Sequence, residues 1–322
     1  MGKPMSEWKR KNVLVTGASG FIGASIAQTL IEVGAVVTCL VKTKGWENDL
    51  DLAGATVYEG DIADYDLMCE ILSSQEIEYV FHLAANAIVR IAARDPMSCY
   101  RTNVMGTVAL LEAARTVGRC KKIIVASSDK AYGDHEVLPY TEDMALQPKN
   151  TYDTSKACTD MIARSYASNY GMPVVVTRCS NVYGPGDPNM SRIIPNSICN
   201  VLRGEPPMLY EDVSLMEREF IYIDDVVDAC LRLALSDEKT NGEAYNIGGT
   251  GARSIEHIVG LTLELMGSKM KTNIVKRESV FKEIQKQYIN AKKLTDAVGW
   301  QPETDLQTGL LKTIKYYKAR VS

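Results

Sequence analysis

Tyr152 and Lys156 stand four residues apart in the polar stretch 152–156. Four residues are about one turn of a helix, so a helix here would place both side chains on one face. A phenol ordinarily loses its proton near pH ~10, and a neighbouring ammonium favours the phenolate and lowers that pKa. The pair therefore predicts a tyrosine that can act as a base near neutral pH. Because this spacing also arises by chance, the interpretation depends on other features of the chain.

Two other features support a catalytic interpretation. An apolar run, 123–128, ends in hydroxyl side chains, the last of which is Ser128. A G-x-x-G-x-x-G pattern over 17–23 lies between the apolar stretch 13–16 and a helical pattern over 24–33. Strand, glycine turn and helix are the context in which a backbone approaches a dinucleotide pyrophosphate at the helix N-terminus. The sequence therefore predicts a dinucleotide-binding turn, and chance is a poor explanation for the three features together.

Small residues follow another buried strand pattern, 79–85, and would let a cofactor lie close over the sheet. The acidic residue that commonly binds the adenosine ribose is missing after strand 36–41, where Lys42 and Lys44 stand instead. A lysine can neutralise a 2′-phosphate, which favours NADP over NAD; the alternative is a solvated basic turn. The residues expected to contact the cofactor are Gly17, Ser19, Gly20, Phe21, Ile22, Gly23, Lys42, Leu83, Ala84, Ala85, Tyr152 and Lys156.

Composition and charge argue against several classes of function. The chain has 322 residues and a formal net charge of −4, which argues against nucleic acid as the main partner. We expect no membrane partner, because no apolar run reaches the ~18 residues that cross a bilayer. The polar N-terminus has no signal-type cleavage site. The eight cysteines and three histidines lack metal-type spacing, so we expect no metal site and reduced thiols in the cytoplasm.

Strand patterns alternate with helical patterns through the first half of the chain, which predicts an α/β fold with a doubly wound parallel sheet of the Rossmann type. The rhythm changes beyond Asn181, where glycine and proline cluster in turns. We expect residues 1–180 and 221–249 to form the dinucleotide-binding domain. Residues 181–220 and 250–322 would form a smaller C-terminal α/β domain that binds the substrate.

With these features together, the chain resembles the extended short-chain dehydrogenase/reductases, and more narrowly the nucleotide-sugar epimerases and dehydratases. Further motifs of that family cover nearly the whole chain. They include Asp61-Ile62, His82-Leu83-Ala84-Ala85, Thr102-Asn103-Val104-x-Gly106-Thr107, Arg178-x-x-Asn181-Val182-Tyr183-Gly184-Pro185, Arg218-x-Phe220-Ile221-Tyr222-Ile223-x-Asp225, Tyr245-Asn246-Ile247-Gly248 and Leu294-x-x-x-Val298-Gly299-Trp300-x-Pro302. The resemblance implies a tightly bound NAD or NADP that oxidises a nucleotide-linked sugar at C4 and later returns the hydride.

The resemblance also implies roles for individual residues. Tyr152 would be the base for the C4 hydroxyl, Ser128 would hydrogen-bond the same hydroxyl, and Lys156 would bind the nicotinamide ribose. Further expected cofactor contacts are Asp61, Ile62 and Asn103, the last of which equally fits a structural bend in its helix. The residues expected to bind the nucleotide sugar are Asn181, Arg192 and Arg218, with a surface salt bridge as the alternative for Arg218.

Asp129 and Lys130 follow Ser128, and this trio is most similar to the CDP-glucose 4,6-dehydratases, as is the segment 191–195. The resemblance favours a 4,6-dehydratase that converts an NDP-hexose, with a CDP-glucose-like substrate preferred, into an NDP-4-keto-6-deoxyhexose. Asp129 would be the acid near the C6 hydroxyl if burial retains its proton. Lys130 would be a base, or would hold a water or the enolate by its charge. The alternative is an exposed ion pair in a loop.

Two other functions stay open. A 4-epimerase of the UDP-glucose or UDP-GlcNAc type would rotate the 4-keto sugar and reduce it from the other face. A non-catalytic nucleotide-binding relative is the third hypothesis, and the intact Ser128, Tyr152 and Lys156 argue against it. Relatives pair through two helices per subunit, so the resemblance implies a homodimer with a four-helix interface formed by 96–117 and 151–170. The apolar stripe on 96–117 could instead face the protein's own sheet.

Overall fold

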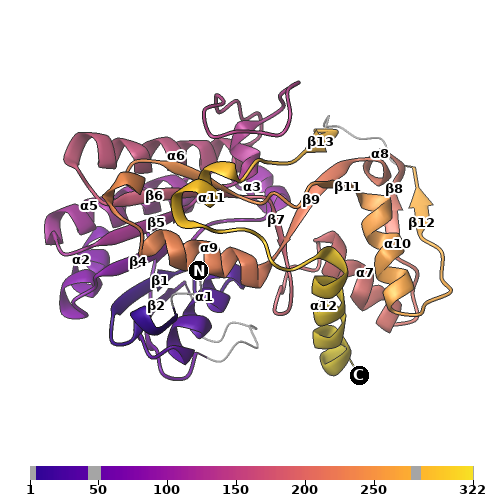
Figure 1. The fold of residues 1–322 in the computed structure, drawn as a ribbon, viewed down its shortest axis with the longest axis horizontal. Helices are drawn as coiled ribbons and strands as arrows, with labels where there is room; N and C mark the ends of the chain where they lie inside the picture. Colours follow the sequence, from indigo (N-terminus) through magenta and orange to yellow (C-terminus); the bar gives the residue numbers. More distant parts are fainter. Residues whose placement is uncertain (1–4, 43–51, 277–283, 322) are drawn as a thin grey trace.

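The computed structural model describes residues 5–42, 52–276 and 284–321. Its main sheet has seven strands in the order β10-β6-β5-β4-β1-β2-β3, and neighbouring strands run parallel (Figure 1). This is the 3-2-1-4-5-6 order of a Rossmann sheet with β10 added at one edge, so the predicted fold class is confirmed. The strands are β1 Asn12–Thr16, β2 Val36–Val41, β3 Thr56–Glu59, β4 Tyr79–His82, β5 Lys122–Ala126, β6 Val174–Cys179 and β10 Ala244–Ile247.

Apolar side chains cover both faces of this sheet, because alternate residues of a strand point to opposite sides. On β1, Val13 and Val15 join the core that contains the buried residues of α1 and α9. Leu14, between them, joins the core that contains those of α2, α5 and α6. These helices are α1 Phe21–Glu32, α2 Tyr65–Ser74, α5 Gly106–Val117, α6 Thr151–Tyr170 and α9 Ile223–Ala234.

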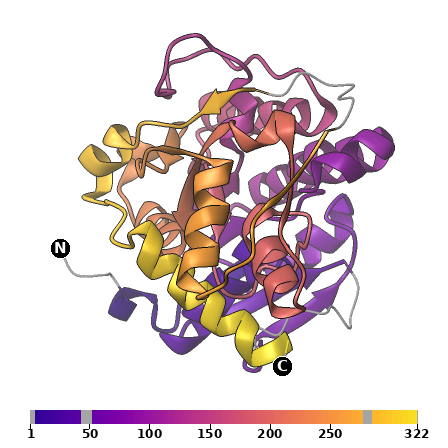
Figure 2. The same ribbon diagram turned by 90° about the vertical axis from the view of Figure 1, so that its right-hand side faces the viewer.

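A second group of elements lies to the right of the large sheet in Figure 1, and Figure 2 shows α10 and α12 on that side. A small sheet has the order β11-β9-β13 with β7 also paired to β9, and β12 pairs with β8 separately. The elements are β7 Asn181–Tyr183, α7 Ile193–Leu202, β8 Met208–Tyr210, α8 Glu211–Ser214, β9 Glu217–Tyr222, β11 Ala252–Ser254, α10 Ile255–Leu265, β12 Asn273–Val275, β13 Lys286–Gln287 and α12 Leu306–Val321. Helix α11, Lys292–Val298, lies instead beside β10 of the large sheet (Figure 1).

The positions of β9, α9 and β10 can be set beside the expected boundaries of the two domains. The division itself stays a prediction. Strand β9 pairs only within the small sheet, although its last two residues, 221 and 222, fall in a range assigned above to the large domain. After it, α9 packs in the same core as α1, and β10 joins the large sheet beside β6. The chain therefore crosses from the second group of elements to the large sheet at the junction of β9 and α9.

The helix expected over 96–117 is divided into three pieces. Helix α4, Pro96–Tyr100, is followed by a π-helical turn, η2 Arg101–Met105, before α5 begins. A π turn widens the helix locally and often occurs near functional sites. Shorter elements complete the description: η1 Met5–Trp8, α3 Val89–Arg94, η3 Asp129–Tyr132 and η4 Glu238–Thr240.

A buried arginine holds α6 against the sheet. Arg178, on β6, is 1% exposed, and its guanidinium donates to both carboxylate oxygens of Asp160 at 2.8 and 3.0 Å. It also donates to the hydroxyl of Tyr132 at 2.8 Å. A buried ion pair offsets its desolvation cost only with such complete hydrogen bonding. One arginine thus fixes both α6, which carries Tyr152 and Lys156, and the turn η3.

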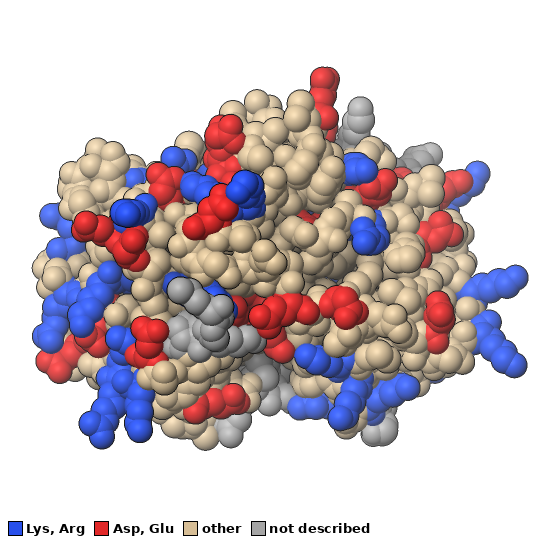
Figure 3. All heavy atoms as spheres, in the orientation of Figure 1, with Lys and Arg blue, Asp and Glu red and all other residues tan. Residues whose placement is uncertain are grey.

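On the face in Figure 3, acidic and basic side chains are interspersed, so neither sign dominates that face. Within the described ranges, no helix is both long and apolar enough to span a lipid bilayer.

Candidate active site

The glycine turn after β1 leaves room for a ligand at the N-terminus of α1. Gly17 has a φ of +70°, and a Cβ there would lie 2.7 Å from the backbone nitrogen of Ala84. A Cβ on Gly23 would lie 2.3 Å from the carbonyl oxygen of Gly17. Both positions therefore require glycine. Gly20 is the N-cap of α1 and has no side chain to cap the helix, so the first backbone N–H groups can bind a phosphate.

A cavity of about 310 Å³ opens over this turn and has room for part of a dinucleotide. Lys42 is exposed at its edge, whereas Lys44 lies outside the described residues. The cavity is lined by most of the predicted cofactor contacts: Gly17, Ser19, Gly20, Phe21, Ile22, Gly23, Lys42, Asp61, Ile62, Leu83, Ala84, Ala85, Tyr152 and Lys156. The glycine turn and the helix N-terminus at its base fit a pyrophosphate, so the residues present are those that a nicotinamide dinucleotide requires.

The structure does not bring Asn103 to this cavity. Its side chain is 1% exposed, its Oδ1 accepts from the backbone nitrogen of Asn86 at 2.7 Å, and its Nδ2 donates to Ser155 Oγ at 2.8 Å. Its carbonyl oxygen, in the π turn, accepts from the hydroxyls of Thr107 and Thr159. Asn103 therefore joins the chain after β4 to α6, which matches the structural alternative rather than the predicted cofactor contact.

Tyr152 and Lys156 lie on the first turns of α6, as their spacing predicted. Asn150 caps this helix by accepting a hydrogen bond from the backbone nitrogen of Asp153 at 2.9 Å. Both members of the pair are buried, with 9% of Tyr152 and 5% of Lys156 exposed. The Lys156 ammonium donates to the carbonyl oxygen of Ala126 at 2.7 Å. Burial lowers the pKa of Lys156 to about 8.

The electrostatic surroundings of Tyr152 differ from the expectation that Lys156 would lower its pKa. Burial raises the pKa of the Tyr152 phenol above its ordinary value, because desolvation disfavours the phenolate. The positive charge of Arg192 is the largest opposing influence, and a hydrogen bond from Ser128 opposes it further. The ammonium of Lys156 is directed at a backbone carbonyl instead. Among the influences that lower the pKa of Tyr152 in this structure, the charge of Arg192 is therefore the largest.

A second cavity of about 650 Å³ adjoins the first. The two share Ile22, Ala87, Ser127, Tyr152 and Arg192, so Tyr152 stands at their junction. Lys156 lines only the first cavity, and the other predicted catalytic and substrate-binding residues line the second: Ser128, Asp129, Lys130, Asn181 and Arg218. The structure therefore brings together residues that are up to ninety positions apart, from Ser128 to Arg218. We name the two the cofactor cavity and the sugar cavity.

Asp129 is a buried carboxyl in the sugar cavity and not an exposed ion pair. It is 3% exposed, and its Oδ1 accepts from Ser128 Oγ at 3.1 Å. Its Oδ2 is buried without a hydrogen-bond partner within the described part of the chain. Burial raises the pKa of Asp129, and the charge of Lys130 opposes that shift. A buried oxygen that finds no partner in the protein is available to a hydroxyl of a ligand.

The two predicted contacts to the nucleotide diphosphate are held by the backbone of the small sheet. Arg218, on β9, is 8% exposed, so the surface salt bridge considered above does not describe it. Its guanidinium donates to the carbonyl oxygens of Ile284 at 2.6 Å and Gln285 at 3.3 Å. Asn181 donates from Nδ2 to the carbonyl oxygen of Glu219 at 3.0 Å. Both side chains are thus positioned by β9 and its neighbours.

Sequence reasoning missed several residues that line the two cavities. Ser127 lines both and precedes Ser128 in the same hydroxyl-bearing run, which was a usable signal. Asp187 lines the sugar cavity but comes from a glycine- and proline-rich turn without periodicity, so no pattern marked it. Further residues missed in the cofactor cavity are Leu40, Gly60, Ala87, Thr102 and Ala126.

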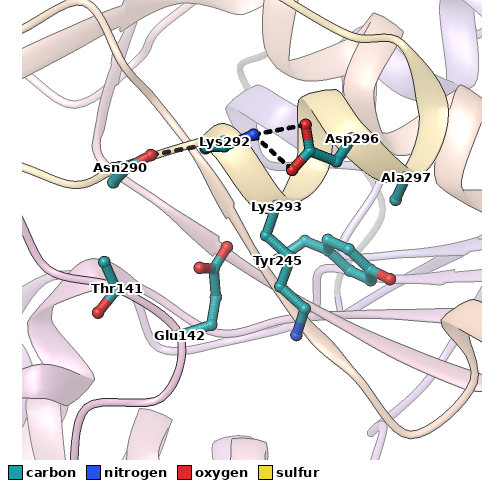
Figure 4. Close-up of a pocket in the computed structure, with 8 residues that line it drawn as sticks. All are labelled: Thr141, Glu142, Tyr245, Asn290, Lys292, Lys293, Asp296 and Ala297. Carbon is teal, nitrogen blue, oxygen red and sulfur yellow. Dashed lines mark hydrogen bonds and ion pairs between the residues drawn. The ribbon is translucent and has the colours of Figure 1, made fainter.

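A separate depression lies beside α11, away from both cavities. Figure 4 shows that Lys292 pairs with Asp296 there, while Glu142 and Tyr245 form the opposite wall. None of the predicted site residues lines it. Lys293 donates to Glu243 at 2.6 Å and to the carbonyl oxygen of Ala244, so its charge is already paired. The depression therefore offers no group that the reaction would need.

Comparison with known proteins places this arrangement in a family. A model of the family described as "NAD dependent epimerase/dehydratase family" matches residues 13–248. The chain belongs to the NAD dependent epimerase/dehydratase family. This agrees with the resemblance noted in the sequence, and the members of this family depend on NAD, as its description states.

Individual relatives include both 4-epimerases and 4,6-dehydratases. The chain is 32% identical to UDP-glucuronate 4-epimerase 3 of Arabidopsis thaliana over 95% of its own length and 76% of that protein. It is 34% identical to a dTDP-glucose 4,6-dehydratase of Streptomyces antibioticus over 95% of its own length and 92% of that protein. The crystal structure of UDP-glucose 4-epimerase with UDP-glucose from Thermotoga maritima superposes with a TM-score of 0.90 at 31% identity, covering 97% of this chain and 100% of that one. A dTDP-glucose 4,6-dehydratase of Bacillus anthracis in complex with NAD gives 0.85 at 28% identity, covering 96% and 97%.

The glycine turn yields a prediction about cofactor binding. Gly17→Ala adds a Cβ that would lie 2.7 Å from the Ala84 nitrogen, so the turn must move away from the pyrophosphate position. We expect the affinity for NAD, measured by calorimetric titration, to fall at least roughly tenfold. Gly171→Ala is the matched control, because Gly171 also has a positive φ, +64°, but nothing lies within 4 Å of its added Cβ. Equal NAD affinity in the parent and Gly17→Ala would contradict this assignment of the turn.

Proposed function

We propose that this protein oxidises a nucleotide-linked hexose at C4 with a bound nicotinamide cofactor and then returns the hydride to the same sugar. The observation that supports this most strongly is the position of Tyr152, which lines both the cofactor cavity and the sugar cavity. A base at that junction can reach a sugar hydroxyl while the carbon that bears it faces the cofactor. The relatives named above act on nucleotide sugars, and this supports the same substrate class here.

The residues of the site divide the proton transfer between them. Tyr152, as the phenolate, would take the proton of the C4 hydroxyl, and Ser128 would hold that hydroxyl by a hydrogen bond. Lys156, which reaches the Ala126 carbonyl at the edge of the cofactor cavity, would bind the nicotinamide ribose. Oxidised nicotinamide, when bound, supplies the hydride acceptor and a positive charge that favours the phenolate. Burial of the pair excludes water from the proton transfer.

This assignment predicts the effect of removing one oxygen atom. Tyr152→Phe removes the base and leaves the ring, so we expect unchanged NAD binding and a turnover reduced roughly 10²–10⁴-fold. Turnover is measured as product formed from a panel of UDP-, dTDP-, CDP- and GDP-hexoses. Tyr170→Phe, at a position that is 58% exposed, is the matched control and should keep the parent's turnover. If the turnover of Tyr152→Phe lies within tenfold of the parent's, Tyr152 is not the base.

Among the reactions that follow C4 oxidation, we propose 4-epimerisation as the first candidate. It needs no group beyond the cofactor, Tyr152, Ser128 and Lys156, because the 4-keto sugar only rotates before the hydride returns. The comparisons support this alternative at least as well as the 4,6-dehydratase that the sequence favoured, since UDP-sugar 4-epimerases are prominent among the relatives. The relatives named here use uridine or thymidine diphosphates, so we propose a pyrimidine nucleotide and leave CDP-glucose as one member of that class.

A 4,6-dehydratase is the second candidate, and one observation supports it. Asp129 is a buried carboxyl in the sugar cavity with an unpartnered oxygen and a raised pKa. A carboxyl that keeps its proton could protonate the C6 hydroxyl as water leaves. Oxidation at C4 acidifies the C5 proton, and Lys130, which also lines the cavity, would accept that proton or stabilise the enolate. The balance is loss of one water from C5 and C6, followed by return of the hydride.

Asp129→Asn separates the two candidates. If the protein is a dehydratase, the variant should still reduce its bound cofactor when the sugar is added but should release no dehydrated product, because the acid is gone. Mass spectrometry detects the loss of water, and absorbance detects the reduced cofactor. If the protein is an epimerase, the parent loses no water from any sugar and the variant interconverts C4 epimers. Asp134→Asn, at an exposed position in the following loop, controls for the change of charge.

We propose NADP as the preferred cofactor, on the basis of Lys42 at the edge of the cofactor cavity and the absence of a carboxylate at the end of β2. A lysine attracts the 2′-phosphate that an acidic residue would repel. Lys42→Asp should therefore weaken NADP binding relative to NAD, as measured by titration of cofactor-free protein with each. Lys149→Asp, an exposed change outside the cavity residues, is the control. Tighter binding of NAD by the parent, together with no change in Lys42→Asp, would show that the proposal is wrong.

We propose a homodimer that pairs through α5 and α6 with the turn that precedes α5. These helices expose large apolar side chains, with 54% of Met105 and 55% of Met161 accessible. Burying them in a four-helix interface would remove that area from water. Light scattering at micromolar concentration should give twice the mass of 35.5 kDa, and the double variant Met105→Glu, Met161→Glu should give the single mass. A parent that is monomeric under these conditions would contradict the proposal.

A further inference from the structure

Arg192 occupies a special position among the charged side chains of the site. It lines both the cofactor cavity and the sugar cavity, and the other residues that do so are Ile22, Ala87, Ser127 and Tyr152. Its guanidinium lies 5.9 Å from the centre of the Phe21 ring, at the start of α1 and so beside the glycine turn. Arg192 is thus the cation at the junction, next to Tyr152 and within reach of ligands on both sides.

Arg192 is held there by a buried carboxylate. Its Nη1 donates to Asp187 Oδ2 at 3.0 Å, and the side chain of Asp187 is 2% exposed, whereas that of Arg192 is 37% exposed. The second oxygen of Asp187 accepts from the backbone nitrogen of Asn189 at 3.0 Å. A carboxylate buried to this extent is costly unless it is fully paired, so its position is determined by these bonds.

The C-terminal helix fixes Asp187 from the opposite side. The hydroxyl of Tyr317, on α12, donates to the backbone carbonyl oxygen of Asp187. Tyr317 is itself 5% exposed and belongs to the core that includes Leu310 and Ile314 of the same helix. Asp187 is therefore bound through its side chain to Arg192 and through its backbone to α12. That helix begins more than a hundred residues later in the chain.

We propose that Asp187 is a positioning residue, which fixes Arg192 at the junction of the two cavities so that its positive charge faces Tyr152 and the diphosphate of the bound nucleotide. This inference rests on the proposed function, because a positive charge facing Tyr152 affects the reaction only if Tyr152 is the base. The charge of Arg192 already lowers the pKa of Tyr152 more than any other influence that opposes burial. Arg192 would thus act on Tyr152 in the sense that the spacing of the sequence assigned to Lys156.

The sign of the effect distinguishes positioning from simple neutralisation. If Asp187 only neutralised Arg192, Asp187→Asn would make the site more positive and would tighten the binding of an anion. If Asp187 positions Arg192, the same variant releases the guanidinium and weakens that binding. The probe is UDP, titrated calorimetrically into the NAD-loaded protein, with dTDP and CDP as further probes. This measurement does not depend on turnover, so it stands even if the proposed reaction is wrong.

We expect Arg192→Met to weaken UDP binding roughly tenfold or more, because a hydrogen bond to a charged group is lost. Asp187→Asn should weaken it several-fold in the same direction, and the double variant should be no weaker than Arg192→Met alone. In the pH profile of turnover, both single variants should move the acidic limb upward, by about one pH unit for Arg192→Met. Arg192→Lys should restore part of each effect.

Asp228→Asn is the matched control. Asp228 is also a buried carboxylate paired with an arginine, Arg232, at 2.8 Å on α9, and neither residue is among those that line the two cavities. This control should lower the midpoint of urea unfolding without changing UDP affinity. Tighter or unchanged UDP binding in Asp187→Asn, or additive losses in the double variant, would overturn the inference. If the parent binds none of UDP, dTDP and CDP, both this inference and the proposed function are overturned. If the parent binds them but turns over no nucleotide sugar, only the proposed function is overturned.

Discussion

The close contact between the turn after β1 and the chain after β4 is the constraint on which the site depends. These strands are neighbours at the centre of the sheet, and their chains separate just beyond their carboxyl ends. Gly17 approaches the backbone at Ala84 so closely that a side chain cannot fit between them. The cofactor cavity opens beside this contact, at the carboxyl ends of the two strands. This is where α/β sheets of this order bind ligands. Everything else in the site is arranged around the cofactor cavity that this contact creates.

Burial decides the electrostatics of the catalytic pair. Both Tyr152 and Lys156 are removed from water, and desolvation, which opposes charge on each group, raises the pKa of the phenol and lowers that of the ammonium, so the two values move apart. The phenol becomes a weaker acid and the ammonium a stronger one. A neighbouring cation must then compensate, and the geometry offers Arg192 from the second group of elements. The proposed chemistry of the pair would therefore be completed by a residue that belongs to another part of the fold.

The sequence predicted those features that are encoded in short patterns. The glycine spacing and its flanking strand and helix located the cofactor cavity, and the tyrosine–lysine spacing located the first turns of α6. It could not predict that the Asn103 side chain is bound to Asn86 and Ser155, because these contacts depend on how the π turn packs against α6. Nor could it pair Asp187 with Tyr317, since that contact arises from packing between elements far apart in the chain. Spacing alone also could not show that burial raises the pKa of Tyr152, because burial depends on the packing of the whole fold.

The central claim is that a hydride leaves C4 and returns to the same sugar molecule. The most direct test follows deuterium placed at C4 of a UDP- or dTDP-hexose through one turnover. NMR of the product should find the label retained, at C4 if the protein is an epimerase and at C6 if it is a dehydratase. Loss of the deuterium to solvent, or a product formed without any change at C4, would contradict the account.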